Sequence, residues 1–226
     1  MNIYLHVESV IRELDSKLLL AVLAASKGHQ VIVSNLSSLI RGMRVGLLPP
    51  GIFHTKSLTP AEDKILRHQK IIDNNFVITS IDEEGGLVDY GYDKFAKIRY
   101  SDKTISQCSA VFGWGYVDVD TLKKKYTKHS TKIYRTGSPR ADLWKPIFSN
   151  YWGIPKVKPK KPFLLISSNL GLVNNKKTPF KVIEWHKKVG YYQRDPELIY
   201  KHLSWIADES RMMHHYVSAI KYITKN

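Results

Sequence analysis

Three consecutive carboxylates, Asp82, Glu83 and Glu84, follow an apolar run over residues 76–81 and precede two glycines. The apolar run predicts a buried strand, and ligands of open α/β sheets bind outside the carboxyl ends of strands. Neighbouring carboxylates push one another's pKa values apart, which provides an acid and a base at one pH. The turn could therefore supply a general base, a nucleophile or a metal ligand; the alternative is a solvated acidic turn. Because side chains alternate in extended chain, Asp82 and Glu84 are expected to share a face.

A second candidate is the turn formed by Gly137, Ser138, Pro139 and Arg140, which ends one predicted strand and begins a helix. The N-terminus of a helix attracts phosphate through its free N–H groups and its dipole. Arg140 adds a bidentate donor to this turn. The alternative is an ordinary strand-to-helix connection in which Ser138 is the N-cap and Pro139 the first helical residue.

Other polar residues also follow predicted strands. Glu8 and Arg12 lie at the first junction between a strand and a helix. Lys56 and Ser57 follow a proline-rich loop and could contact a charged ligand, or could simply belong to a surface loop. Asn169 ends a later predicted strand and could contact a ligand across a cleft between domains.

Several motifs of known chemistry are absent from the sequence. The first junction lacks the G-x-G-x-x-G fingerprint, which argues against a dinucleotide cofactor. Neither a G-x-x-x-x-G-K-[ST] loop nor a G-x-S-x-G elbow occurs, which argues against P-loop and serine hydrolase chemistry. The nine histidines include no H-E-x-x-H pattern. We expect no metal and no cofactor.

The order of elements predicts a βαβ unit at the start of the chain. Residues 2–7 and 29–33 are typical of strands, and residues 12–27 are typical of a helix that ends at Gly28. Within that helix, apolar residues recur with the spacing of one helix face: Leu14, Leu18, Leu19, Val22 and Leu23.

The same alternation continues to about residue 150. Further strands are predicted over residues 45–48, 76–81, 110–115 and 132–136, with a loop over 49–57. Helices are predicted over residues 37–43, 59–73, 92–107, 119–129 and 141–148, with Thr59 as N-cap and Pro60 as first residue of the second. The glycines of the strand over 110–115 suggest close backbone approach. This alternation predicts an α/β fold, a Rossmann-like parallel sheet with helices on both faces.

The remainder of the chain predicts a short second domain. Residues 1–155 form the Rossmann-like domain, and residues 156–162, rich in lysine and proline, form a linker. Residues 163–226 predict a partial domain, with one buried strand over 163–169 and helices over 179–188 and 196–222.

Composition restricts the class of protein. The 226 residues contain 43% hydrophobic residues and one cysteine, Cys108, which predicts a folded protein of the reducing cytoplasm without a disulfide framework. We see no secretory signal, and no apolar run approaches membrane-spanning length. The net charge is +15, and residues 156–188 contain nine lysines and one acid. Such a stretch could contact an anionic membrane surface; nucleic acid binding is less favoured because no stacking aromatics are interleaved with the charges.

Several motifs in order resemble the surface carbohydrate biosynthesis proteins of bacteria. The resemblance begins at residues 12–21 (RELDSKLLLA) and 28–31 (GHQV), and continues at 48–53 (LPPGIF) with Lys56 and Ser57. It extends through 82–85 (DEEG), 113–115 (GWG), 136–143 (TGSPRADL) and 166–171 (ISSNLG), and so covers about residues 1–175.

The resemblance implies a glycosyltransferase of the GT-B plan, in which two Rossmann-like domains face each other across a cleft. Relatives in capsule and lipopolysaccharide assembly transfer sugars such as Kdo from a nucleotide-activated donor, and CDP-glycerol transferases contain a similar Gly-x-Pro-Arg turn. It implies that Asp82, Glu83 and Glu84 face the cleft with Arg140 nearby. A nucleotide-sugar and a glycan acceptor would be the substrates.

The chain departs from this plan after the linker, because family members continue through several more β-α units. A partner chain could supply the missing donor domain, which would make this chain one half of a split enzyme. Alternatively, the chain is a non-catalytic module that binds a glycan or a partner enzyme.

Overall fold

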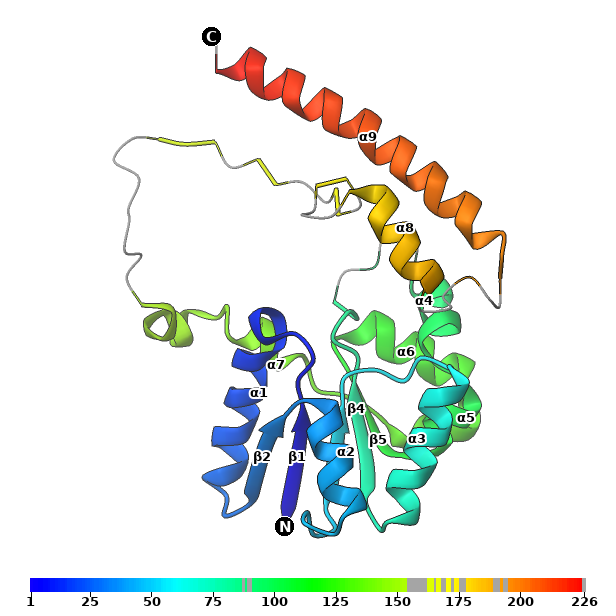
Figure 1. Cartoon of the computed structure of the whole chain (residues 1–226). Helices are drawn as coiled ribbons and strands as arrows, with labels where there is room; N and C mark the ends of the chain where they lie inside the picture. Colours follow the sequence, from blue (N-terminus) through cyan, green and yellow to red (C-terminus); the bar gives the residue numbers. More distant parts are fainter. Residues whose placement is uncertain are drawn as a thin grey trace. The chain divides into compact units, whose positions relative to one another are not determined.

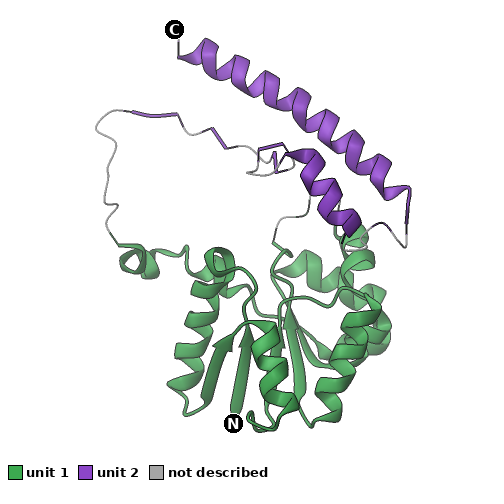
Figure 2. Cartoon of the chain, in the orientation of Figure 1, with its two compact units in different colours: residues 1–155 green, residues 156–226 purple. Residues whose placement is uncertain are grey.

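The computed structural model describes residues 1–86, 88, 91–153, 162–164, 166, 167, 170, 171, 173, 174, 178–188, 192 and 195–224. The chain divides into two compact units, Met1–Pro155 and Lys156–Asn226 (Figure 2). Residues 156–161 of the predicted linker, and Asn169, lie outside the described residues.

A six-stranded parallel sheet forms the centre of the first unit and confirms the predicted α/β, Rossmann-like fold (Figure 1). Its strands are β1 (Asn2–His6), β2 (Gln30–Ser34), β3 (Ile52–Thr55), β4 (Val77–Ile81), β5 (Cys108–Gly113) and β6 (Ile133–Arg135). They lie in the order β2-β1-β3-β4-β5-β6, with Ile3 in register with both Val31 and Ile52. The chain therefore places β2 on one side of β1, and then adds β3 to β6 in sequence on the other side. Because such crossovers are right-handed, this reversal places the first two helices on opposite faces.

The helices of the first unit connect these strands. They are α1 (Val10–Ala25), α2 (Leu36–Arg44), α3 (Glu62–Asp73), α4 (Tyr92–Arg99), α5 (Asp102–Ser106), α6 (Tyr116–Lys125) and α7 (Pro139–Asp142). Two 3₁₀ segments follow α6 and α7, at Thr127–Lys132 and Pro146–Trp152. The helix predicted over 92–107 is therefore divided into α4 and α5. The helices predicted over 119–129 and 141–148 end earlier than expected, at Lys125 and Asp142.

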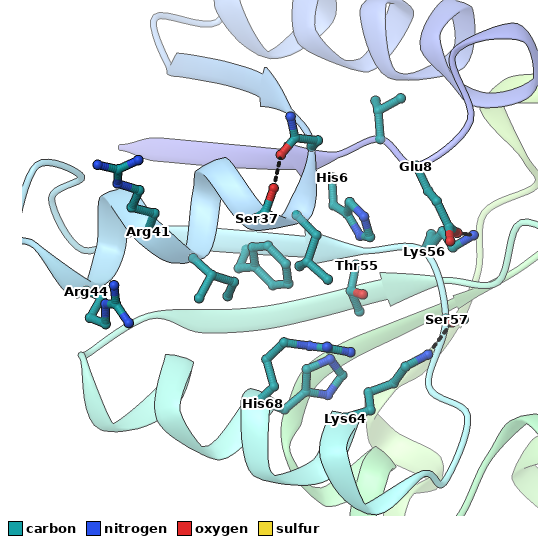
Figure 3. A pocket seen from close by; sticks show the side chains of 16 residues that line it. His6, Glu8, Ser37, Arg41, Arg44, Thr55, Lys56, Ser57, Lys64 and His68 are labelled. Atoms are coloured by element: carbon teal, nitrogen blue, oxygen red, sulfur yellow. Dashed lines mark hydrogen bonds and ion pairs between the residues drawn. The ribbon is translucent and has the colours of Figure 1, made fainter. Parts of the chain in front are cut away.

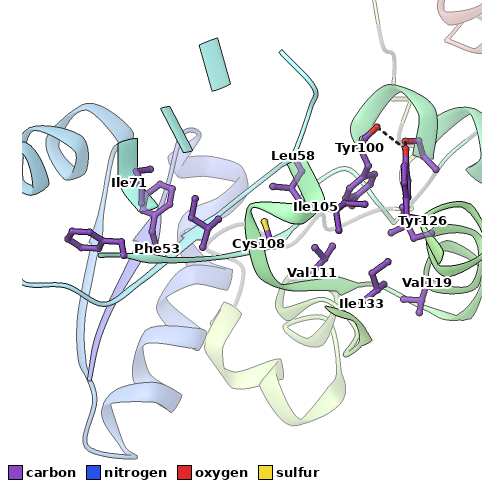
Figure 4. Close-up of a cluster of buried hydrophobic side chains, with 14 of the residues drawn as sticks. Phe53, Leu58, Ile71, Tyr100, Ile105, Cys108, Val111, Val119, Tyr126 and Ile133 are labelled. Carbon is purple, nitrogen blue, oxygen red and sulfur yellow. Dashed lines mark hydrogen bonds between the residues drawn. The ribbon is translucent and has the colours of Figure 1, made fainter. Parts of the chain in front are cut away.

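The main core consists of buried side chains packed on the sheet (Figure 4). Ile105 and Val111 are completely buried, and each such side chain contributes about 1.5–3 kcal/mol relative to exposure. The Tyr126 hydroxyl donates to the carbonyl oxygens of Ala96 and Tyr100, at 3.0 and 2.9 Å. These bonds satisfy a buried polar atom and attach the end of α6 to α4.

The strand predicted over residues 45–48 is wrong, because these residues form a turn and β3 begins at Ile52 within the predicted loop. Two contacts explain the shift. The Tyr4 hydroxyl donates to the carbonyl oxygen of Pro49 at 2.6 Å. A Cβ on Gly51 would lie only 2.3 Å from the carbonyl oxygen of Asn2, so glycine alone allows the chain to enter the sheet here.

The start of α3 also differs from the prediction. The helix begins at Glu62, and Ala61 rather than Thr59 occupies the N-cap position. The Thr59 hydroxyl instead accepts a hydrogen bond from the Lys64 ammonium at 2.5 Å. The side chain that was expected to cap the helix is therefore used within the loop that precedes it.

In α1 the helix is confirmed, but the apolar residues do not all face the core. Leu18, Val22 and Leu23 are between 41% and 66% exposed, whereas Glu13 and Lys17 are at most 1% exposed. The helix therefore buries charged residues near its N-terminus, where α1 meets the carboxyl edge of the sheet.

In the second unit, α8 (Pro179–Lys188) and α9 (Leu198–Ile223) confirm the two predicted helices. The strand predicted over residues 163–169 is wrong where the structure describes it. Phe163, Leu164, Ile166 and Ser167 belong to no strand, and all four are exposed. A single strand without a neighbour has no backbone partners, which explains why an apolar run alone did not produce one.

None of the helices in the described part of the chain is long and apolar enough to cross a membrane.

Candidate functional site

The acidic turn lies directly after β4, at the carboxyl edge of the sheet, as the sequence predicts. Its three carboxylates differ in burial and in their partners, since Asp82 and Glu84 both contact Arg99 whereas Glu83 contacts Lys17. Asp82 and Glu83 are 2% and 6% exposed, whereas the Glu84 side chain is 51% exposed. The three acids are therefore not chemically equivalent.

Asp82 forms a two-pronged ion pair with Arg99, the last residue of α4. Nε of Arg99 donates to Oδ2 of Asp82 at 2.8 Å, and Nη2 donates to Oδ1 at 2.9 Å. The backbone N–H of Glu84 also donates to Oδ1, at 2.9 Å. Burial raises the pKa of Asp82 above its ordinary value, and the hydrogen bonds and charge of Arg99 oppose that rise. Asp82 therefore closes the turn and holds it to α4.

Glu83 is directed to the other side of the turn, toward α1. Its Oε1 lies 2.6 Å from Nζ of Lys17, and both side chains are buried. Its backbone N–H donates to the carbonyl oxygen of Lys56 at 3.1 Å, and its own carbonyl oxygen accepts from Nη1 of Arg140 at 3.3 Å. Glu83 thus connects the turn to α1, β3 and the segment after β6.

Glu84 lies between two arginines. Its Oε2 is 3.2 Å from Nη1 of Arg99, and its Oε1 is 3.8 Å from Nη1 of Arg12. Asp82 and Glu84 therefore both reach Arg99, which confirms that they share a face. Glu84 is the one acid of the turn that remains open to solvent and to a ligand.

The two glycines of the turn lie under the indole ring of Trp114. A Cβ on Gly86 would come within 2.3 Å of Cζ3 of Trp114, and one on Gly85 within 3.0 Å of its Cδ1. The indole N–H donates to the carbonyl oxygen of Asp82 at 2.7 Å, which fixes the ring. At Gly86 a Cβ would overlap the ring, and at Gly85 it would be in tight contact with it, so both glycines and Trp114 belong to one arrangement.

A cavity of about 650 Å³ opens beside this turn, and we call it the turn cavity. Its walls combine charged and aromatic side chains: Arg12, Glu83, Glu84, Gly86, Phe95, Trp114, Arg140, Ala141 and Trp144. Trp144 is 68% exposed, and Nε of Arg12 is buried without a hydrogen-bond partner among the described residues. The cavity therefore offers guanidinium donors, one carboxylate and aromatic surface.

Three of the predicted residues, Glu8, Lys56 and Ser57, line a different cavity of about 830 Å³ between α2 and α3 (Figure 3). We call it the switch-point cavity, since it lies past the carboxyl ends of β1 and β3, where the strand order reverses. Lys56 forms ion pairs with Glu8 and Glu13, and burial lowers its pKa. The Ser57 hydroxyl accepts from Nζ of Lys64 at 2.7 Å.

The turn over residues 137–140 connects β6 to α7. Ser138 is the N-cap of α7 and Pro139 is its first residue, as the alternative interpretation predicted. The helix has only four residues, so its dipole is small, and the Ser138 side chain makes no capping hydrogen bond. Gly137, at φ +81°, lines a separate and mainly apolar cavity with His54 and Phe112. Arg140 therefore reaches the turn cavity without Gly137 or Ser138.

Sequence reasoning missed Lys17 and Arg99, the cations that neutralise Glu83 and Asp82. One signal for Lys17 was available, because Glu13, Ser16 and Lys17 have the spacing of one helix face. Lys17 therefore belonged to a polar face at the predicted carboxyl edge. Nothing local marks Arg99, which lies 17 residues after Asp82.

Among the described residues, no group of three or more His, Cys, Asp or Glu side chains could hold a metal ion. No protein-family model, curated protein or solved structure matches this chain.

Proposed function

We propose that this protein takes part in sugar transfer during the synthesis of bacterial surface polysaccharide, and that the turn cavity holds a saccharide. The observation that carries the proposal is the position of Glu84. This half-exposed carboxylate lies between Arg12 and Arg99 on the wall of a cavity that also contains Trp114 and Trp144. Ligand cavities typically combine such aromatic surface with a few placed polar groups.

The chemistry would need one base and one anion-stabilising group. In sugar transfer, an acceptor hydroxyl attacks the anomeric carbon while the bond between that carbon and the phosphate oxygen breaks. Glu84 would take the proton from the hydroxyl, because it is the accessible acid of the turn. Arg12 and Arg140 would stabilise the negative charge that develops on the departing phosphate. Asp82 and Glu83 would position the turn without touching substrate.

The described residues after the linker do not supply a donor domain for this proposal. The described residues of Lys156–Asn226 contain two helices and no strand. We propose that a partner chain supplies the nucleotide-sugar site. We also propose that transfer occurs at the cytoplasmic side of the membrane.

A second candidate function, a non-catalytic glycan-binding module, is favoured by a specific observation. Two of the three acids, Asp82 and Glu83, form ion pairs with Arg99 and Lys17. These pairs stabilise the fold and leave neither carboxylate available for proton transfer. In this case Glu84 accepts hydrogen bonds from sugar hydroxyls and transfers no proton.

Glu84→Gln separates the two functions, because glutamine keeps the shape and one acceptor oxygen but cannot act as a base. Glu62→Gln, at an exposed acid of α3, is the matched control. Transfer from CMP-, UDP- and CDP-activated sugars would be measured with the intact chain, alone and with candidate partner chains. If Glu84→Gln loses transfer by about 10²-fold or more while Glu62→Gln does not, the result supports a catalytic role for Glu84.

Other outcomes decide between the remaining alternatives. Equal transfer in both variants contradicts the catalytic role of Glu84. Saccharide binding without any transfer, measured by calorimetry, supports the binding module. If the folded chain shows neither binding nor transfer in any combination, both functions are wrong.

A further inference from the structure

The switch-point cavity concentrates positive charge. Five cations line it, Arg41, Arg44, Lys56, Lys64 and Arg67, against one acid, Glu8, which is paired with Lys56. Figure 3 shows Arg41 and Arg44 at one end of the cavity and Lys56 and Lys64 at the other. Like charges gathered in one cavity repel one another, so this arrangement favours an anionic ligand.

Among the described residues, three of these cations, Arg41, Arg44 and Lys64, form no ion pair with an acid, whereas Lys56 is paired with Glu8 and Glu13. Lys64 donates to the hydroxyls of Ser57 and Thr59 instead. Arg67 has one exposed partner, Asp63, at 3.8 Å. Burial and nearby cations lower the pKa of Lys64 to about 8.

Two buried histidines provide an independent observation. His68 is 1% exposed and His6 is 6% exposed, and both line the cavity. The Nδ1 atom of each ring is buried and has no hydrogen-bond partner among the described residues. A buried polar atom without a hydrogen-bond partner destabilises the folded protein, so a ligand that hydrogen-bonds there removes that cost. In Figure 3 the two side chains extend into the cavity from β1 and α3.

The N-terminal turn of α2 forms another part of the wall. The Asn35 side chain caps this nine-residue helix by accepting from the Ser38 N–H at 2.9 Å, and Ser37 also lines the cavity. The first N–H groups of a helix have no partner within the helix and favour phosphate. Leu36, Ile40 and Phe53 add an apolar surface that an inorganic ion alone would leave uncovered.

We propose that the switch-point cavity binds a small organic molecule that carries phosphate groups. A phosphate monoester carries about −1.5 to −2 charges at pH 7, so two phosphates match the surplus of cations where one carboxylate does not. The cavity volume of about 830 Å³ lies within the range of small-molecule sites, roughly 300–1,000 Å³. This site is separate from the turn cavity and does not depend on the proposed sugar transfer.

The test measures binding of four probes to the full chain by calorimetry at constant ionic strength: inorganic phosphate, inorganic pyrophosphate, CMP and CDP. We expect saturable one-to-one binding, with CDP or pyrophosphate tighter than the probes with a single phosphate. The double variant Arg41→Gln, Arg44→Gln removes two exposed cations and should weaken binding on the order of tenfold for each arginine. Lys123→Gln with Lys124→Gln removes the same charge from the exposed face of α6 and should leave affinity unchanged.

Three results would overturn the proposal. They are absence of saturable binding for all four probes, equal losses in the two double variants, and tighter binding of a single-stranded oligonucleotide than of CDP. A second readout is the imidazole resonance of His68, assigned with His68→Gln, which should shift on addition of the tightest probe. Glu84→Gln should retain this binding, so failure of sugar transfer and failure of this site remain distinguishable.

Discussion

Nζ of Lys17 lies 2.6 Å from Oε1 of Glu83, and the two side chains are 1% and 6% exposed. This pair joins the acidic turn to a helix that lies more than 60 residues earlier in the sequence. Its burial means that each charge depends on the other, since an isolated buried charge is costly.

The first prediction concerns that pair. Lys17→Met leaves Glu83 buried without its partner and should reduce the free energy of unfolding by about 3–5 kcal/mol. Adding Glu83→Met should restore part of this loss, because the double variant contains no unpaired charge. Urea denaturation of the four proteins in the cycle measures both effects. Lys145→Met is the control, since its exposed pair with Asp142 should contribute at most about 1 kcal/mol. If the losses of the two single variants simply add in the double variant, Lys17 and Glu83 are not energetically coupled.

The second prediction concerns pH. Burial lowers the pKa of His6 and His68 from 6.5 to about 4, so both rings stay neutral in the folded protein at pH 5. The unfolded chain binds protons as the pH falls through 6.5, and the folded chain does not until about pH 4. Stability is therefore complete above about pH 6.5 and is lost toward pH 4, by about 2 kcal/mol for each histidine at pH 5.

Urea midpoints at pH 7 and pH 5 measure this dependence. His68→Gln should make it shallower, because glutamine does not titrate. His215→Gln, at an exposed position of α9, should leave it unchanged. Equal slopes for all three proteins would show that His68 is not buried in its neutral form.

The third prediction concerns the glycines beneath Trp114. Gly86→Ala places a Cβ 2.3 Å from the ring, so the ring must move, at a cost of about 1–3 kcal/mol. Trp114 should lose its bond to Asp82, which near-ultraviolet circular dichroism and unfolding midpoints would detect. Gly171→Ala, where a Cβ meets no atom within 4 Å, is the control and should change neither signal.

The fourth prediction concerns the exposed aromatic ring of the turn cavity. Trp144→Ala should change the free energy of unfolding by no more than about 0.5 kcal/mol, since the side chain is 68% exposed. Saccharide affinity, measured by calorimetry, should nevertheless fall about tenfold if the ring supports the ligand. Ile147→Ala, at an exposed apolar residue nearby, should leave affinity unchanged. Unchanged affinity in the Trp144 variant would exclude this ring from the saccharide site.

Much of the fold could be predicted from local patterns. Alternating apolar runs and amphipathic segments identified β1, α1, β2 and β4, and the position of Asp82 after β4 placed the acidic turn at the carboxyl edge. The position of β3 was not predicted, because the strand joins the sheet where Gly51 lies close to Asn2, a residue distant in the sequence.

The partners of the acidic turn could not be predicted in the same way. Alternation indicated that Asp82 and Glu84 share a face, but Arg99 meets them only because α4 returns to the end of β4. Likewise, the switch-point cavity assembles His6, Arg41 and His68 from three elements, and its site depends on strand order rather than on any one motif.

One oxygen atom connects the two cavities. Oε1 of Glu13 accepts from Arg12, on the wall of the turn cavity, at 2.9 Å and lies 3.5 Å from Nζ of Lys56, on the wall of the switch-point cavity. A ligand that drew Lys56 away would leave Oε1 of Glu13 to Arg12, which would weaken the contact of Arg12 with Glu84. Thermodynamic reciprocity then requires that a ligand bound at Arg12 change affinity at Lys56 by the same factor. If both cavities bind ligands as proposed, this shared counter-ion would make the affinity of each cavity depend on the ligand in the other.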